Sequence, residues 1–128
     1  MAARIQAQGF DDVTQSHLLL FRHEGIDGRQ PGEIAVSSGL SKQSVNDALR
    51  YLEDRGYVRR RAHPTDGRAR IMRLTARGRR LDAAIRAASH EVEQEWRDRV
   101  GDREWHAFVA VLEQMAEGAR HGDLREGS

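Results

Sequence analysis

A group of polar side chains on one predicted helix is the strongest chemical signal in this sequence. The apolar residues between Ser41 and Arg55 recur at the spacing of one helix face. They are Val45, Ala48, Leu49 and Leu52. The residues beside that stripe carry hydrogen-bonding groups, and side chains of these types can read base edges and phosphates of duplex DNA.

The polar types divide between base contacts and backbone contacts. Gln and Asn can pair bidentately with adenine, and Asp can accept from cytosine. The predicted base-reading set is Gln43, Ser44, Asn46 and Asp47. The set better suited to phosphates is Ser41, Lys42 and Arg50. The alternative is a plain solvated helix face, which is easier to accept for any single residue than for the whole group.

An arginine-rich β-hairpin is predicted directly after this helix. Residues 57–63 and 68–74 read as strands around a turn at residues 64–67, Pro-Thr-Asp-Gly. We expect Arg61 and Arg70 to contact phosphates, and His63 at the tip to touch the DNA backbone. Arg73 has two possible places, in solvent or near the base of the hairpin.

Positive charge is concentrated in this part of the chain. Residues 42–80 contain 12 Lys and Arg against 4 Asp and Glu, a net charge of +8, whereas the whole chain carries +1. The other 89 residues therefore carry −7. Such a division predicts a surface for a polyanion, although a chance cluster on a solvated face is the alternative.

Composition limits the other functions. The 128 residues suffice for a compact domain, and the absence of cysteine excludes disulfides and thiolate metal sites. The six histidines lack metal-ligand spacing, and no catalytic triad or phosphate-binding glycine loop is present, so we expect neither an enzyme nor a cofactor. No apolar run suits a membrane span or signal peptide, which favours a cytoplasmic protein without a membrane partner.

The predicted elements form a mostly α-helical fold with a small β-hairpin wing. A short helix within residues 1–12 is followed by a helix at 13–23, and then by a helix-turn-helix from Pro31 to Arg55. Gly39 supplies the turn, Ser41 caps the second helix, and Thr75 caps a long helix that ends near Arg99. The predicted domains are a short N-terminal segment (1–12), a winged helix-turn-helix (13–75), a helical dimerisation region (76–119) and a flexible tail (120–128).

The last two predicted helices, at about 76–99 and 103–119, carry apolar stripes with coiled-coil-like spacing. Such a stripe usually packs against another helix, here between subunits, but it could also line a ligand pocket. The predicted dimer-interface residues are Leu81, Ile85, Val92, Trp96, Trp105, Phe108 and Leu112.

The order of these elements resembles the MarR family of bacterial transcription regulators. The resemblance lies between Leu40 and Leu81, in the stretches LEDRGYVRR (52–60), DGRA (66–69) and LTARG (74–78). It implies a winged helix-turn-helix joined to a helical dimerisation lobe. Barely a dozen residues precede Val13, so the N-terminal helix of that lobe is expected to be missing or much reduced.

The resemblance also implies a function. It implies a homodimer on a palindrome-like double-stranded DNA operator, with Arg68 entering the minor groove and Asp66 holding that arginine. It further implies a ligand-responsive repressor whose effector is small and apolar or an aromatic acid. The alternative is a winged-helix protein-interaction module that has lost operator binding.

Overall fold

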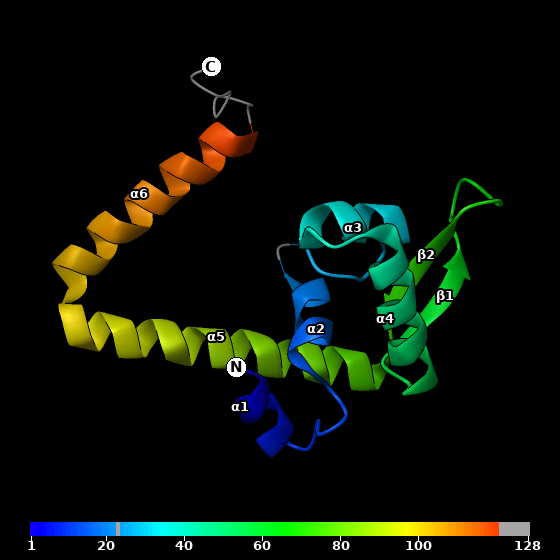
Figure 1. Ribbon diagram of the computed structural model, residues 1–128, viewed down its shortest axis with the longest axis horizontal. Coiled ribbons are helices and arrows are strands. Elements are labelled where there is room, and N and C mark those ends of the chain that lie inside the picture. Colours follow the sequence, from blue (N-terminus) through cyan, green and yellow to red (C-terminus); the bar gives the residue numbers. More distant parts are fainter. Residues whose placement is uncertain (23, 121–128) are drawn as a thin grey trace. The chain divides into compact units, whose positions relative to one another are not determined.

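The computed structural model describes residues 1–22 and 24–120, with side chains described as far as Gly118 (Figure 1). Backbone contacts divide the chain into two compact units, Met1–Ser89 and His90–Ser128, which are treated separately below. The division falls inside one helix rather than at its start. The predicted flexible tail lies outside the described residues from position 121 onward.

The first unit begins with three short helical segments. These are α1 (Ala2–Ala7), α2 (Gln15–Leu18) and the 3₁₀ turn η1 (Leu19–Phe21). A single helix was predicted for residues 13–23, and the described part of that stretch is instead α2 followed by η1. Leu20 and Phe21 are both buried, and a tighter 3₁₀ turn lets neighbouring residues enter the same core. His23 lies outside the described residues.

The helix-turn-helix consists of α3 (Pro31–Ser38) and α4 (Lys42–Asp54). Pro31 starts α3, where its missing N–H costs nothing. Gly39 has a left-handed φ of 73°, and the Ser41 hydroxyl accepts the backbone N–H of Ser44 at 3.1 Å. These contacts confirm the predicted turn and the predicted cap.

The wing is a two-stranded antiparallel hairpin of β1 (Val58–Ala62) and β2 (Arg70–Leu74). Arg59 lies opposite Arg73, and Arg60 lies opposite Met72. Met72 also pairs through its backbone with Arg29 in the loop before α3. This bridge pairs the outer edge of β2. Ile71 and Met72 are both buried, although neighbouring residues of a strand point to opposite faces.

The long helix α5 (Ala76–Val100) starts against the wing and spans both units. The Thr75 hydroxyl accepts the backbone N–H of Gly78 at 3.0 Å and caps the helix, as predicted. Leu81, Ala84 and Ala88 then join a core that includes Ile5, Ile34 and Leu49.

The second unit contains the end of α5 and all of α6 (Asp102–Arg120). None of its described side chains, residues 90–118, is buried. Among all described residues, no helix combines the length and the apolar character needed to cross a membrane.

Gly78→Ala should destabilise the first unit by about 1–3 kcal/mol, the usual cost of overpacking. A Cβ at Gly78 would overlap the backbone carbonyl oxygen of Tyr57 and approach Leu74 Cδ2 at 3.1 Å. Gly32→Ala on α3 is the matched control, because a Cβ there meets nothing within 4 Å. Urea unfolding measures both, and equal stability of the two variants would contradict the packing argument.

Candidate nucleic-acid interface

The polar face of α4 is free to meet a ligand. Val45, Leu49 and Leu52 are fully buried on the opposite face and anchor the helix in the core. The side chains of Gln43, Ser44 and Asp47 are exposed, and Asn46 is half-buried. The structure therefore brings the predicted base-reading residues to one surface of one rigid helix.

Hydrogen bonds already link members of this face. Gln43 Nε2 lies 3.4 Å from both carboxylate oxygens of Asp47, and Arg50 Nη1 lies 3.9 Å from one of them. The negative charge of Asp47 thus has a local cation and an amide donor. Ser41 uses its hydroxyl as the helix cap and donates it to the Ser44 hydroxyl at 3.0 Å, which orders the first turn.

The wing tip is organised by two predicted site residues. His63 Nδ1 accepts the backbone N–H groups of Thr65 and Asp66 at 3.1 and 3.2 Å. The Asp66 carboxylate accepts the backbone N–H of Arg68 at 3.1 Å. Asp66 therefore fixes the main chain of Arg68, and the Arg68 guanidinium extends from an ordered turn.

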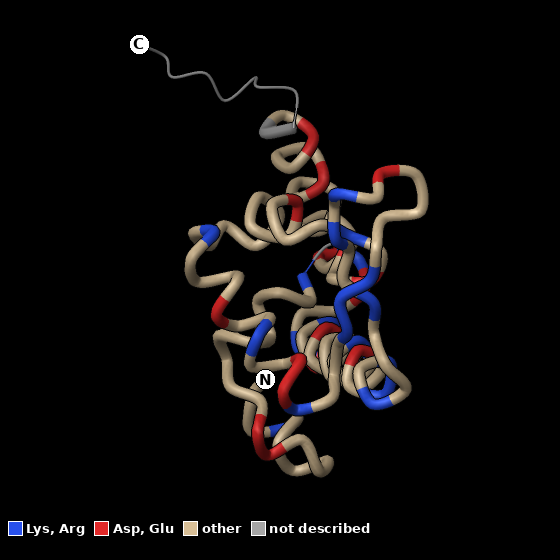
Figure 2. The backbone as a smooth tube through the Cα atoms, turned by 90° about the vertical axis from the view of Figure 1, so that its right-hand side faces the viewer, with Lys and Arg blue, Asp and Glu red and all other residues tan. Residues whose placement is uncertain are grey.

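The arginines of the wing are exposed. Lys and Arg segments follow both strands of the hairpin (Figure 2). Arg61, Arg68 and Arg70 are exposed, and no side-chain partner of theirs occurs among the described residues. Arg60 is different, because its Nε lies 3.4 Å from Glu53 on α4 and ties the wing to that helix.

A junction that the sequence did not reveal fixes the end of α4. The Tyr57 hydroxyl donates to Asp12 Oδ1 at 2.5 Å, and Arg77 Nη2 donates to Asp12 Oδ2 at 3.0 Å. The Tyr51 hydroxyl donates to the Asp12 backbone carbonyl at 2.6 Å. Burial, followed by the hydrogen bond to Asp12, raises the pKa of Tyr57 above its ordinary value.

A second unpredicted junction fixes the base of the wing. Asp27 accepts the backbone N–H of Leu74 at 2.8 Å, and its carboxylate lies 3.6 Å from Arg73 Nε. Arg73 therefore lies near the base of the hairpin, one of its two expected places. Arg29 donates to the backbone carbonyl of Gly25 and to the Ser37 hydroxyl at 3.0 Å each, which ties the loop to α3.

His17 joins the start of α2 to α4. Its Nδ1 accepts the backbone N–H of Thr14 at 3.0 Å, and its ring stacks on Tyr51 with 4.3 Å between centroids. Burial lowers the pKa of His17 below 6.5, and the nearby carboxylate of Asp12 partly offsets this. The neutral ring is therefore the form that caps α2.

The predicted dimer-interface residues separate into two groups. Leu81 has no exposed surface and packs inside the first unit, which corrects its assignment to an interface. Ile85 is half-buried against the same core. The other predicted residues lie in the second unit, where Trp96, Phe108 and Leu112 are 49%, 49% and 48% exposed and Val92 and Trp105 are half-buried.

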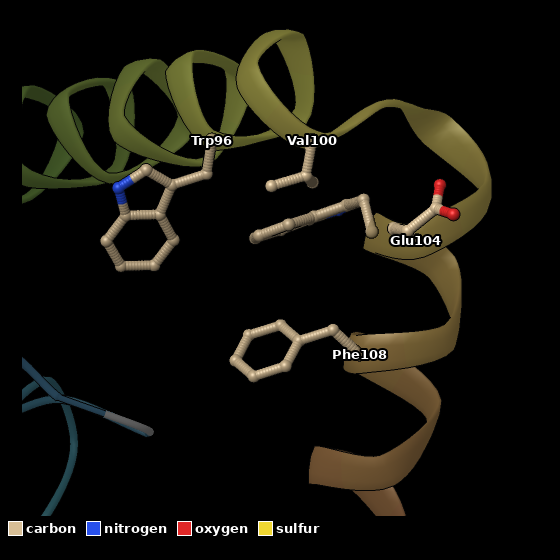
Figure 3. Close-up of a pocket in the computed structure, with 5 residues that line it drawn as sticks. Trp96, Val100, Glu104 and Phe108 are labelled. Carbon is tan, nitrogen blue, oxygen red and sulfur yellow. The ribbon is translucent and has the colours of Figure 1, made fainter.

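Aromatic residues of the second unit line a hollow of about 370 Å³ at the turn between α5 and α6. Trp96 and Val100 come from α5 and Phe108 from α6, while the Glu104 carboxylate points away from the rings (Figure 3). Trp105 lies 6.1 Å from Trp96 and 5.9 Å from Phe108 between ring centroids. The described residues contain no cluster of three side chains suited to a metal ion.

Comparison with known proteins identifies this arrangement. Residues 8–69 match the MarR family. That segment belongs to the MarR family. The match covers α2, both helices of the helix-turn-helix, β1 and the turn of the wing, and it agrees with the predicted family for this segment.

Two curated relatives match parts of this chain. Transcriptional regulator HosA of Escherichia coli O111:H- is 34% identical over 83 residues, which are 65% of this chain and 59% of HosA. HTH-type transcriptional repressor Rv2887 of Mycobacterium tuberculosis is 41% identical over 69 residues, 51% of this chain and 50% of the relative. This chain thus spans between half and three fifths of their length. Both names are those of regulators, which agrees with the predicted lack of enzymatic activity.

Solved structures share the fold. A MarR transcriptional regulator from Methanosarcina mazei Go1 has a TM-score of 0.69 at 24% identity, over 83% of this chain and 76% of that one. The S. aureus MepR–DNA complex has a TM-score of 0.67 at 24% identity, over 91% of this chain and 87% of that one. At 24% identity, these two structures support a shared fold.

Acid should weaken the fold through His17. Its pKa is lowered in the folded chain, so the unfolded chain binds more protons as pH falls through about 6.5, and stability then decreases. His17→Gln keeps an acceptor at the third helical position but does not titrate. Urea unfolding between about pH 8 and pH 5 should show the parent losing stability relative to this variant. Parallel curves would contradict the assignment.

Proposed function

We propose that this chain is a sequence-specific, double-stranded DNA-binding transcriptional regulator that acts as a homodimer. The observation that carries the proposal is the exposed polar face of α4 beside an exposed, arginine-rich wing. Helices of this kind enter the major groove, whose base edges carry a distinct pattern of donors and acceptors. MepR, which shares the fold, was crystallised as a DNA complex.

In this proposal α4 and the wing read adjacent grooves. Gln43, Asn46 and Asp47 meet base edges, with the Gln43–Asp47 contact exchanged for contacts to bases. Arg68 enters the minor groove from the ordered tip, where the guanidinium meets concentrated negative potential. Ser44 belongs to the same predicted base-reading set. The predicted backbone contacts are Ser41, Lys42, Arg50, Arg61, His63 and Arg70. The Asp66 carboxylate and His63 Nδ1 accept backbone N–H groups within the tip and stabilise its turn.

The second unit supports the homodimer. A helix with an apolar stripe and no buried side chain leaves much of its hydrophobic surface in water. Val100, Phe108, Val111, Leu112 and Met115 are each between 48% and 57% exposed. A second copy would cover this surface and place two copies of α4 on two half-sites.

Repression and control by an effector are the finer parts of the proposal. The name of the M. tuberculosis relative, a transcriptional repressor, supports repression. A hollow of about 210 Å³ in the first unit is lined by Leu18, Leu19 and Ile85 together with Arg22 and Ser89. Its apolar walls and guanidinium suit a small aromatic acid. Such a regulator would act in the cytoplasm.

Selection from random duplexes with the purified protein, followed by binding titrations, tests DNA reading. Arg68→Ala should weaken binding about tenfold or more and lower the salt slope by roughly one, because a charge-assisted contact to DNA is lost. Gln43→Ala or Asn46→Ala should relax base choice at one position. Arg86→Ala is the control, since that exposed arginine pairs with Asp82 on α5 at 3.0 Å.

Absence of duplex binding at low salt would overturn the proposal and favour a protein-interaction module. Binding that none of the three variants changes would show that the docking arrangement is wrong.

Leu112→Glu should convert the dimer to a monomer. Burying an unpaired charge costs roughly 3 kcal/mol or more, which raises the dissociation constant at least about a hundredfold. Val36→Glu is the matched control, because Val36 is 85% exposed on α3 and is not part of the apolar surface of the second unit. Light scattering across a concentration series measures both variants, and a dimer unaffected by Leu112→Glu would exclude this face.

A further inference from the structure

A hollow lined by arginines lies at the base of the wing, where the hairpin meets the start of α5. Its volume is about 410 Å³. The basic side chains that line it are Arg59, Arg61, Arg73 and Arg79. Only Arg61 belongs to the set assigned to DNA above, so the hollow is largely unaccounted for by groove reading.

The hollow lies on the face of the wing that points away from α4. Arg60 reaches Glu53 on α4, which fixes the direction of that side chain. Successive side chains of a strand point to opposite faces, so Arg59 and Arg61 point to the other face. The hollow is therefore separate from the surface formed by α4.

The positive charge of this hollow is poorly neutralised. Arg59 and Arg73 lie directly opposite each other across the hairpin, a like-charge pair that destabilises a sheet. Asp27 lies 3.6 Å from Arg73, but within residues 1–22 and 24–120 no carboxylate pairs with Arg59, Arg61 or Arg79. An anion from outside the described chain would relieve this repulsion.

The start of α5 adds to the same field. Arg79 Nη1 donates to the Leu74 carbonyl at 3.1 Å, which holds the guanidinium beside the first turn. That turn contains no acidic residue to offset the positive end of the helix dipole. Guanidinium groups bind phosphate oxygens bidentately, and several of them around one concave surface suit a group with more than one negative charge.

We propose that this hollow is a second phosphate-binding site beside the groove-reading surface, with which it shares only Arg61. Its ligand carries clustered phosphate charge, supplied either by a free polyphosphate compound or by the DNA backbone beyond the half-site. The site does not depend on the proposed function, because a free polyphosphate would bind it without DNA.

The first arm of the test titrates inorganic tripolyphosphate into the full chain by calorimetry at constant ionic strength. The double variant Arg59→Gln/Arg73→Gln should bind it roughly a hundredfold more weakly, because it removes two charge-assisted hydrogen bonds and each is worth about a factor of ten. Arg68→Gln/Arg70→Gln removes equal charge from the wing tip and should stay within about twofold of the parent. All four side chains are exposed, so both variants should fold, and thermal unfolding checks this.

The second arm compares a selected duplex with the same duplex lengthened by about ten base pairs, one helical turn, at each end. If the DNA backbone is the source, the longer duplex binds the parent more tightly and Arg59→Gln/Arg73→Gln removes that gain. Binding of tripolyphosphate with loss only in that variant identifies a free phosphate compound instead.

The inference is overturned if Arg59→Gln/Arg73→Gln binds tripolyphosphate no more weakly than Arg68→Gln/Arg70→Gln and also keeps the parent's gain in affinity for the longer duplex. Failure of the proposed function looks different, since no duplex then binds in any variant and the tripolyphosphate arm still decides this site.

Discussion

The direction of α4 depends on hydrogen bonds that converge on Asp12. Its backbone carbonyl oxygen and its carboxylate accept from Tyr51 on α4, from Tyr57 before β1 and from Arg77 on α5. Apolar burial holds these elements together but is not directional, whereas hydrogen bonds constrain angles as well as distances. A helix and a wing can meet adjacent grooves only at a fixed mutual angle. The proposed DNA reading therefore depends on this junction, although none of its side chains belongs to the assigned DNA contacts.

The wing combines strong charge repulsion with little structure of its own. Two strands of five residues would be marginal in water without further packing. Burial of Val58 and Met72, the backbone bridge from Arg29 and the acceptance of Leu74 N–H by Asp27 supply that packing. These contacts lie between the base and the middle of the hairpin. This packing lets the hairpin tolerate the facing arginines Arg59 and Arg73. The contacts at the tip stabilise only the turn itself.

Interactions between residues close in the sequence could be predicted, whereas contacts between distant residues could not. Gly39, Ser41 and Thr75 act within a few residues of their own positions, so their types and spacing were enough to place the turn and the two caps. Asp12 and Tyr57 are 45 residues apart, and no periodic pattern links them. The split of residues 13–23 into α2 and η1 has the same origin, because burial of adjacent side chains depends on the whole core.

The apolar stripe of α5 shows the same limit within one helix. Its coiled-coil-like spacing continues along the helix and does not separate residues that face their own chain from residues that face a second copy. In the structure, Leu81, Ala84 and Ala88 pack inside the first unit. Farther along the same helix, the large side chain of Trp96 is half exposed. Periodicity identifies which face of a helix is apolar, but burial in the folded chain is needed to decide whether that face meets its own chain or a second copy.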